Sequence, residues 1–170
     1  IAGEGEITEK IVRQAEMLGA SNIHFVGFVS EEDKVALLFL CSALVLPSCQ
    51  RSEAFGIVLL EAARQFRPMI TTELGTATSW VNQQANTGLV VNPNNQAQLE
   101  KALIFMHQYP GIAQKMGTLA GYRFETMFDI TLMAKKYINI YQKVIFDKKL
   151  AGHGSGTAAK KRLISRANSQ

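Results

Sequence analysis

Apolar residues recur along the chain at two different spacings, which separate helices from strands. Over residues 7–20 they return every three or four positions and stop at Gly19, a pattern that predicts an amphipathic helix. Short apolar runs that predict strands follow at 23–28, 43–46, 69–72 and 88–91. Because short apolar strands alternate with helices, the pattern predicts an α/β fold: a Rossmann-like parallel sheet with helices on both faces.

The segments between and after these strands carry helix signals. Ser30 followed by Asp33 forms a capping pattern that starts a helix over 31–40. A further helix is predicted over 55–66, and a helix or a turn over 76–84. After the last strand the chain ends in several consecutive helices, at 97–107, 111–128 and 130–146.

The distribution of charge divides the chain into a folded domain and a tail. Of the 18 Lys and Arg residues, 14 lie in residues 1–150, where they balance all 14 Asp and Glu. Residues 151–170 carry the rest, so 18 − 14 = 4 accounts for the net charge of +4. We therefore expect a domain over 1–150 and a flexible basic tail over 151–170. Residues 1–5 look like the end of a strand, so this domain is expected to be N-terminally truncated.

The same composition bears on partners and location. A basic face for nucleic acid is not expected on the neutral domain, whereas the tail could touch anionic lipid as a peripheral membrane contact. The sequence contains no run of 18 apolar residues, so it predicts no membrane-spanning helix. Cys41, Cys49 and the three scattered histidines lack metal-ligand spacing, and no metal is expected. We expect a reducing, cytoplasmic location, with the inner face of the membrane as the alternative.

The residues most suited to chemistry lie in the stretch LPSCQRSEAFGIVLLE at 46–61. A predicted strand ends there, and Gly56 opens a helix at the sheet edge where open α/β folds bind ligands. A helix N-terminus offers N–H groups and a positive dipole end to phosphate, and a residue without a side chain lets an anion approach. Glu53 and Glu61 would flank this phosphate site and accept hydrogen bonds from sugar hydroxyls.

A purely structural interpretation of the two glutamates stays open. Glu53 is also an acid near a helix start, where the helix dipole favours it, and Glu61 is compatible with a solvated helix position. Against that, Glu61 stands between Leu60 and Ala62, and a carboxylate in apolar company usually has a partner.

The stretch 46–61 resembles the E-x7-E region of the retaining glycosyltransferases of the family 4 type, which have the GT-B fold. The resemblance extends, in order and spacing, from residue 1 to about residue 145. Its further segments are IAGEG at 1–5, NIHFVGFV at 22–29, ALVLPS at 43–48, TGLVVNP at 87–93 and the Y-x3-Y helix at 137–144.

This resemblance implies a C-terminal, donor-binding domain of a nucleotide-sugar glycosyltransferase. It assigns Glu53, the candidate catalytic residue, to hydroxyls of the transferred sugar, and Glu61 to the ribose hydroxyls. Three backbone amides would bind the diphosphate and sugar: those of Phe55, Gly56 and Ile57.

The resemblance also implies two more distant parts of the donor site. Gly27, Phe28 and Val29 would border the base, and Gly75 and Thr76 would line the other side of the sugar pocket. The family's basic residue for the donor phosphates belongs to a segment upstream of this chain, as does the acceptor-binding domain. The chain alone is therefore expected to be inactive.

The expected function is the transfer of a hexose from a GDP- or UDP-sugar to a glycan or lipid-linked acceptor, without a metal or cofactor. The segment 73–82 resembles mannosyltransferases of bacterial surface polysaccharide synthesis, which makes mannose the candidate sugar. The first alternative is a non-catalytic module of the same fold that binds a nucleotide or sugar. A flavodoxin-like or response-regulator-like domain is the second, but the sequence lacks the acidic cluster that it needs at its strand ends.

Overall fold

The computed structural model describes the backbone of residues 1–167 and the side chains of residues 1–148. The chain divides into two compact units, residues 1–123 and 124–170. The predicted domain limit at residue 150 stays a prediction. The flexible basic tail expected over residues 151–170 likewise stays a prediction.

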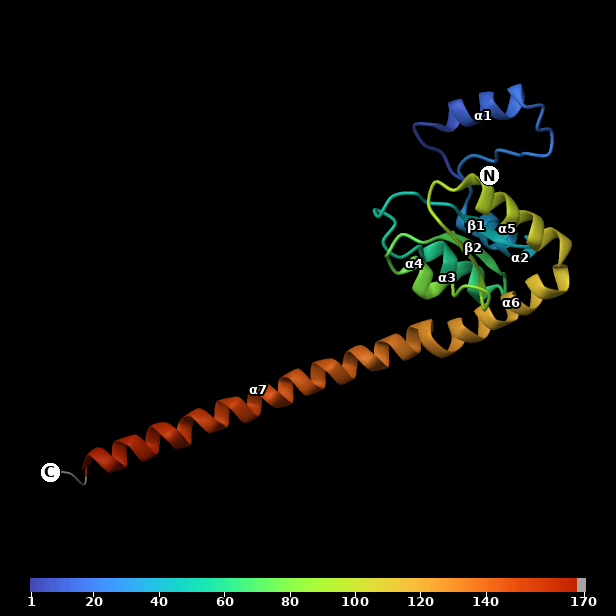
Figure 1. Ribbon diagram of the computed structural model, residues 1–170. Coiled ribbons are helices and arrows are strands. Elements are labelled where there is room, and N and C mark those ends of the chain that lie inside the picture. Colours follow the sequence, from blue (N-terminus) through green and yellow to red (C-terminus); the bar gives the residue numbers. More distant parts are fainter. Residues whose placement is uncertain (168–170) are drawn as a thin grey trace. The chain divides into compact units, whose positions relative to one another are not determined.

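The first unit contains helices that precede, separate and follow the strands of a parallel sheet (Figure 1). In chain order the elements are α1 (Thr8–Met17), α2 (Glu31–Leu40), β1 (Leu44–Leu46), α3 (Ile57–Arg64), β2 (Met69–Thr72), α4 (Thr78–Val81), β3 (Gly88–Val91), α5 (Gln96–Gln108) and α6 (Pro110–Arg123). The strands lie in the order β1-β2-β3. Leu44 is paired with Met69, and Met69 with Gly88.

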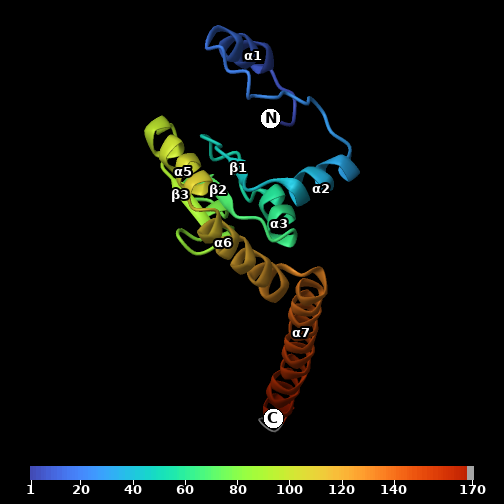
Figure 2. The same cartoon turned by 90° about the vertical axis from the view of Figure 1, so that its right-hand side faces the viewer.

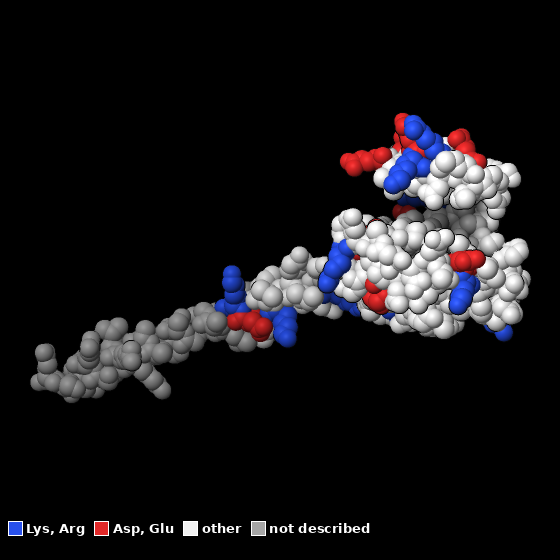
Figure 3. All heavy atoms as spheres, turned by 45° about the horizontal axis from the view of Figure 1, so that its top comes forward, with Lys and Arg blue, Asp and Glu red and all other residues white. Residues whose placement is uncertain are grey.

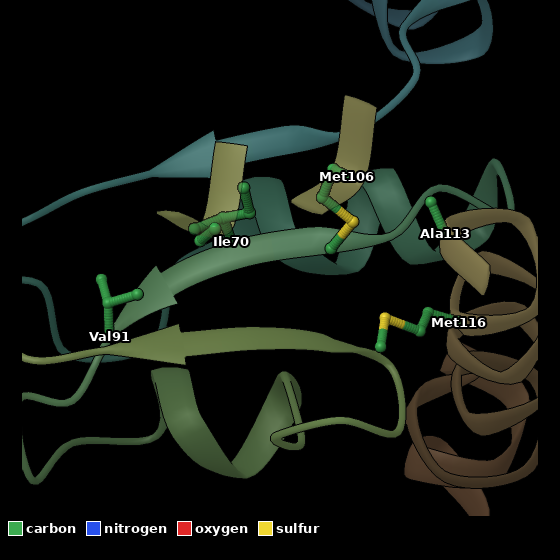
Figure 4. Close-up of a cluster of buried hydrophobic side chains, with 6 residues drawn as sticks. Ile70, Val91, Met106, Ala113 and Met116 are labelled. Carbon is green, nitrogen blue, oxygen red and sulfur yellow. The ribbon is translucent and has the colours of Figure 1, made fainter. Parts of the chain in front are cut away.

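Helices cover both faces of this sheet, as the sequence predicted; Figure 2 shows α5 on one side of the strands and α3 on the other. The central strand β2 is buried along its whole length. On the α5 side, its Ile70 packs in a cluster with Val91 of β3 and with apolar side chains of α5 and α6 (Figure 4). On the opposite side, Leu59 and Ala62 of α3 are fully buried.

The predicted strand at 23–28 is wrong, because this segment forms only an isolated parallel bridge between Ala2 and Gly27. The N–H of Gly3 donates to the carbonyl of Gly27 at 2.7 Å, and the N–H of Val26 donates to that of Ile1 at 3.0 Å. Gly27 adopts a φ of +63°, outside the extended region, which ends the pairing after a few residues. Apolar composition alone therefore predicted a longer strand pairing than the single bridge that forms.

Two predicted helix boundaries depend on identifiable backbone features. The Ser30 hydroxyl accepts the N–H of Asp33 at 3.0 Å and donates to its carboxylate at 2.7 Å, which confirms the predicted cap of α2. Helix α3 ends at Arg64, two residues earlier than predicted, and Phe66 then takes a left-handed φ of +56°.

Helix α6 approaches this left-handed turn through two glycines. A Cβ on Gly117 would lie 2.3 Å from the carbonyl oxygen of Phe66, and one on Gly121 would lie 2.2 Å from its ring. Both distances are below any ordinary contact, so only glycine allows α6 to pack here. The turn after α3 and the last helix of the unit are thereby held together.

The second unit begins with a π-helical turn, η1 (Phe124–Phe128), and continues as the long helix α7 (Ile130–Ala167). The Asp129 carboxylate caps α7, because its Oδ1 accepts the N–H groups of Thr131 at 2.8 Å and Leu132 at 3.3 Å.

Among the described residues, no helix is long and apolar enough to cross a membrane. Figure 3 shows basic and acidic side chains mixed over α1, where Arg13 and Glu9 form an ion pair.

A buried amide joins β2 to β3 through the loop that connects them. The Asn82 Nδ2 donates to the carbonyl oxygen of Leu89 at 3.0 Å and to that of Met69 at 3.3 Å, and also to the hydroxyl of Thr71. Its Oδ1 accepts the hydroxyl of Thr87 at 3.0 Å. All the hydrogen-bonding groups of this side chain are thus used by the sheet and its connection.

We expect Asn82→Ala to lower the free energy of unfolding by about 2–4 kcal/mol, because it removes these bonds inside the core and leaves a small void. Urea unfolding measures the change. Asn86→Ala is the matched control: Asn86 is exposed in the same loop and donates only to Gln83, at 2.8 Å. Its loss should cost about 0.5 kcal/mol or less. Equal losses for the two variants would contradict the role of the buried amide.

Candidate functional site

The candidate site lies where the loops after β1 and β2 meet. The carboxyl ends of parallel strands face the same edge of a sheet, so these two loops leave side by side. The N–H of Ala77 donates to the carbonyl oxygen of Ala54 at 3.0 Å, and the Arg51 guanidinium donates to that of Gly75 at 3.3 Å. The hydroxyl of Thr72, at the end of β2, donates to the carbonyl oxygen of Ser48. The loops that carry Glu53 and Gly75 therefore form one edge.

Gly56 is the N-cap of α3, as predicted, but the structure adds a steric reason for a glycine. Its φ of +72° lies in the left-handed region, which is strained for residues with a side chain. A Cβ would also lie 2.9 Å from Leu59 and 3.1 Å from Leu46. The turn from β1 into α3 is thus packed against the first turn of the helix and the end of the strand.

Glu53 occupies the N-terminus of α3. Its Oε1 accepts the backbone N–H of Gly56 at 3.0 Å, and its side chain is half-buried. This bond satisfies one of the N–H groups that a helix start leaves unpaired, and it places a negative charge at the positive end of the helix dipole. The N–H of Gly56, which was expected to face a ligand, is thus hydrogen-bonded to Glu53. The next residue, Ile57, has a side chain that is 69% exposed.

Glu61, one helical turn further along α3, is held by a cation that the sequence analysis did not single out. Its Oε1 lies 2.9 Å from the Nζ of Lys34 on α2, and both side chains are largely shielded, with exposures of 31% and 26%. Lys34 also contacts Glu31 at 2.8 Å. The two carboxylates raise the pKa of Lys34, which stays protonated at neutral pH. The sequence signal that could have indicated this residue is that Lys34 is a single lysine directly before the apolar run VALLFL at 35–40.

The loop after β2 places Gly75 and Thr76 next to the Glu53 loop, as the predicted sugar pocket requires. Gly75 has a left-handed φ of +63°, and its N–H donates to the Glu73 carboxylate at 2.9 Å. The hydroxyl of Thr76 lies 3.2 Å from that of Thr78 at the start of α4. Nothing lies within 4 Å of a Cβ built on Gly75, so this side of the loop is open.

The residues expected to border the base are held by a different part of the chain. The Gly27 carbonyl oxygen accepts the N–H of Gly3. A Cβ on Gly27 would lie 2.8 Å from the Glu4 carboxylate. The side chain of Phe28 is 86% exposed, and Val29 is half-buried. Their predicted role at the base stays a prediction, because these contacts do not join them to α3.

A hollow of about 330 Å³ adjoins the carboxyl ends of the strands. It is lined by Pro47, Cys49, Thr72, Val91, Asn92, Asn94, Asn95, Gln96 and Leu99. A larger hollow of about 560 Å³ lies at the opposite ends of β1 and β2, beside Ser42 and Arg67. The smaller hollow lies at the same ends of the strands as the candidate site and includes Thr72 in its lining, but neither lining includes Glu53 or Glu61.

No cluster of three His, Cys, Asp or Glu side chains suited to a metal ion occurs in the part of the chain that the structure describes. Both cysteines are free, and burial raises the pKa of the half-buried Cys41 thiol. The expectation that no metal or cofactor is needed stays a prediction.

Comparison with known proteins identifies the family. Residues 1–120 match the family described as glycosyl transferases group 1, and this match covers more than half of the 170 residues. The chain therefore belongs to the group 1 glycosyl transferases, which confirms the family that the E-x7-E resemblance indicated.

Two curated relatives are similar over most of the chain. D-rhamnosyltransferase WbpZ of Pseudomonas aeruginosa is 46% identical over 128 residues, which are 75% of this chain and 34% of that protein. O-antigen chain mannosyltransferase C of Escherichia coli is 39% identical over 148 residues, 87% of this chain and 40% of that protein. The chain thus spans between 34% and 40% of the length of these relatives.

Solved structures confirm the predicted fold. Anabaena Alr3699/HepE in complex with UDP aligns with a TM-score of 0.76 at 17% identity, over 84% of this chain and 40% of that chain. WaaG, a glycosyltransferase involved in lipopolysaccharide biosynthesis, aligns with a TM-score of 0.66 at 28% identity, over 82% of this chain and 36% of that chain. The parallel sheet with its helices is the Rossmann-like arrangement of GT-B glycosyltransferases.

Gly56→Ala is expected to lower the free energy of unfolding by about 2–4 kcal/mol, because it adds overpacking against Leu46 and Leu59 to the strain of a left-handed alanine. Gly75→Ala is the matched control, since Gly75 has a similar φ but open space at its Cβ. It should cost only about 1–2 kcal/mol. Chemical denaturation compares the two, and a larger loss at Gly75 would contradict the packing argument.

Proposed function

We propose that the chain is the donor-binding part of a retaining hexosyltransferase. The intact enzyme moves a sugar, with mannose as the candidate, from a GDP- or UDP-sugar to a glycan or lipid-linked acceptor in surface polysaccharide synthesis. The observation that carries this proposal is the pair of glutamates on α3 and its entry loop, each held by one carboxylate oxygen: Glu53 by the N–H of Gly56, and Glu61 by Lys34.

The arrangement suits a nucleotide-sugar in three parts. The first turn of α3 presents backbone N–H groups and the positive end of the helix dipole to a diphosphate. A carboxylate has several acceptor positions, so Glu53 and Glu61 retain Oε2 for hydroxyl groups. Glu53 then receives the sugar, beside Gly75 and Thr76 of the neighbouring loop, and Glu61 receives the ribose.

The chemistry that this site supplies is mainly electrostatic. As the bond between the sugar and the diphosphate breaks, negative charge grows on the diphosphate, and oriented amides at α3 stabilise it. Glu53 orients the reacting sugar, which lowers the barrier by positioning. No step in this proposal requires a metal or cofactor.

Similarity to named proteins supports the donor and the pathway class. The two relatives are named a rhamnosyltransferase and an O-antigen chain mannosyltransferase, both of which name a hexose-type sugar as the group transferred. Alr3699/HepE has been solved with UDP and with UDP-glucose, which supports a nucleotide-sugar as the ligand of the shared fold.

The alternative is a module that binds the same ligand without transfer. In this proposal the acceptor-binding domain and the rest of the enzyme are supplied by polypeptide beyond these 170 residues, so the isolated chain is expected to bind a nucleotide diphosphate weakly and to transfer nothing. Transfer by a longer protein that contains the chain distinguishes the enzyme from the module.

Glu61→Gln and Glu53→Gln should separate binding from transfer in such a longer protein. Glu61 contacts a part of the donor that does not react, so its loss should weaken nucleotide diphosphate binding by roughly 1.5–3 kcal/mol, the value of a hydrogen bond to a charged group. Glu53→Gln keeps an oxygen that can cap Gly56, so free nucleotide should bind almost as before. Turnover should fall instead, because the reacting sugar is no longer held.

Calorimetric titration with UDP and GDP, together with a steady-state transfer assay, measures both effects. Glu100→Gln, on the exposed side of α5, is the control and should change neither quantity. Unchanged binding and unchanged transfer in both glutamate variants would show that the pair is structural only.

A further inference from the structure

Lys34 joins two helices through two carboxylates, and nothing in the E-x7-E pattern assigns it a role. Its Nζ lies 2.9 Å from the Oε1 of Glu61 on α3, and 3.0 Å and 2.8 Å from the two carboxylate oxygens of Glu31 on α2. Glu31 is 85% exposed, whereas Lys34 and Glu61 are mostly covered. The partly buried bond to Glu61 is therefore the more constrained of the two.

The position of Glu61 explains why it needs a cation. The two residues that follow it, Ala62 and Ala63, are buried, so its side chain leaves the helix at the border of the apolar core. A carboxylate there loses part of its hydration, and an ammonium group at hydrogen-bond distance compensates this loss. The same bond selects one orientation of a side chain that otherwise has several rotamers.

We propose that Lys34 is a positioning residue for the ribose of the donor: it holds Glu61 by Oε1 so that Oε2 is directed to the ribose hydroxyls. This inference rests on the proposed function, because it takes Glu61 to be the ribose ligand. Lys34 acts through Glu61 and does not touch the nucleotide.

The charge of the cluster separates this role from direct phosphate binding. One ammonium group between two carboxylates leaves a net charge of −1 on the set Glu31, Lys34 and Glu61. Such a set repels a diphosphate and favours groups that donate hydrogen bonds, as ribose hydroxyls do. The diphosphate is instead left to amides in the first turn of α3 other than that of Gly56, which Glu53 already engages.

The test uses the 170-residue chain and five probes: UDP, GDP, the 2′,3′-dideoxy form of each, and inorganic pyrophosphate. Dissociation constants come from titrations followed by amide NMR, which also reports weak binding. Lys34→Met keeps the length of the side chain and removes its charge. It should weaken the tighter-binding ribonucleotide about 3- to 10-fold, less than Glu61→Gln, because the ribose ligand remains but is no longer oriented.

The loss should be confined to the ribose. Wild-type protein should prefer the ribonucleotide to its dideoxy form, and Lys34→Met and Glu61→Gln should both lose most of this preference. Pyrophosphate should bind equally well to all three proteins. Lys34→Arg, which retains a cation, should stay within about threefold of the wild type. The double variant should bind no worse than Glu61→Gln alone, since the two residues act as one unit.

Lys101→Met on the exposed side of α5 is the control for a change of net charge and should bind like the wild type. If Lys34→Met does not fold, Lys34→Gln, which also removes the charge and is one atom shorter, carries the same comparison. A loss of pyrophosphate binding equal to that of the ribonucleotide would overturn the proposal, as would a Lys34 variant that keeps its ribose preference while Glu61→Gln loses it. No loss in Glu61→Gln would instead overturn the ribose role of Glu61, and the proposal for Lys34 with it.

Discussion

The left-handed turn at Gly56 is the constraint on which the candidate site depends. Residues 47–56 connect β1 to α3, and Gly56 ends this loop with a left-handed turn, where a side chain would crowd Leu46 and Leu59. The turn fixes where the helix begins, and so where its unpaired N–H groups and its dipole end lie relative to the sheet edge. Glu53 stands three residues before this turn and Glu61 five residues after it. The separation of the two carboxylates is therefore set by the backbone.

The neighbouring loop depends on the same turn. The bond from Ala77 to Ala54 joins backbone to backbone and needs no particular side chain, whereas the bond to Gly75 comes from the guanidinium of Arg51. The parallel pairing of β1 with β2 brings the loops together, and the buried amide of Asn82 ties β2 to β3 beneath them. Hydrogen bonds of the connecting segments thus link the buried strands to the loops that carry the candidate site.

The sequence predicted those parts of the fold that depend on local patterns. The runs at 69–72 and 88–91 became strands at the same residues, because each is short, apolar and bounded by turn residues. The run at 23–28 has the same appearance but forms only a bridge, since pairing also needs a partner strand along its length. Glu53, Gly56 and Glu61 could be proposed as site residues because they lie close together in the sequence. Lys34 was missed because its distance to Glu61 depends on how α2 packs on α3, across 27 residues of chain.

Both glutamates share one feature that local patterns could not reveal: the protein binds each of them through Oε1. A carboxylate that is free in solution must be ordered when a ligand arrives, and that ordering opposes binding. Here the ordering has already occurred on folding, by an amide for Glu53 and by an ammonium group for Glu61. The two partners differ in a useful way. An amide at the N-cap is neutral and leaves the charge of Glu53 in place. In the proposed role that charge lies beside the reacting sugar, where positive charge develops as the bond to the diphosphate breaks. In its proposed role Glu61 serves hydroxyls that do not react and needs only orientation, which the ammonium group of Lys34, shared with Glu31, supplies. Under the proposed function, each partner therefore suits the part of the donor that is assigned to its carboxylate.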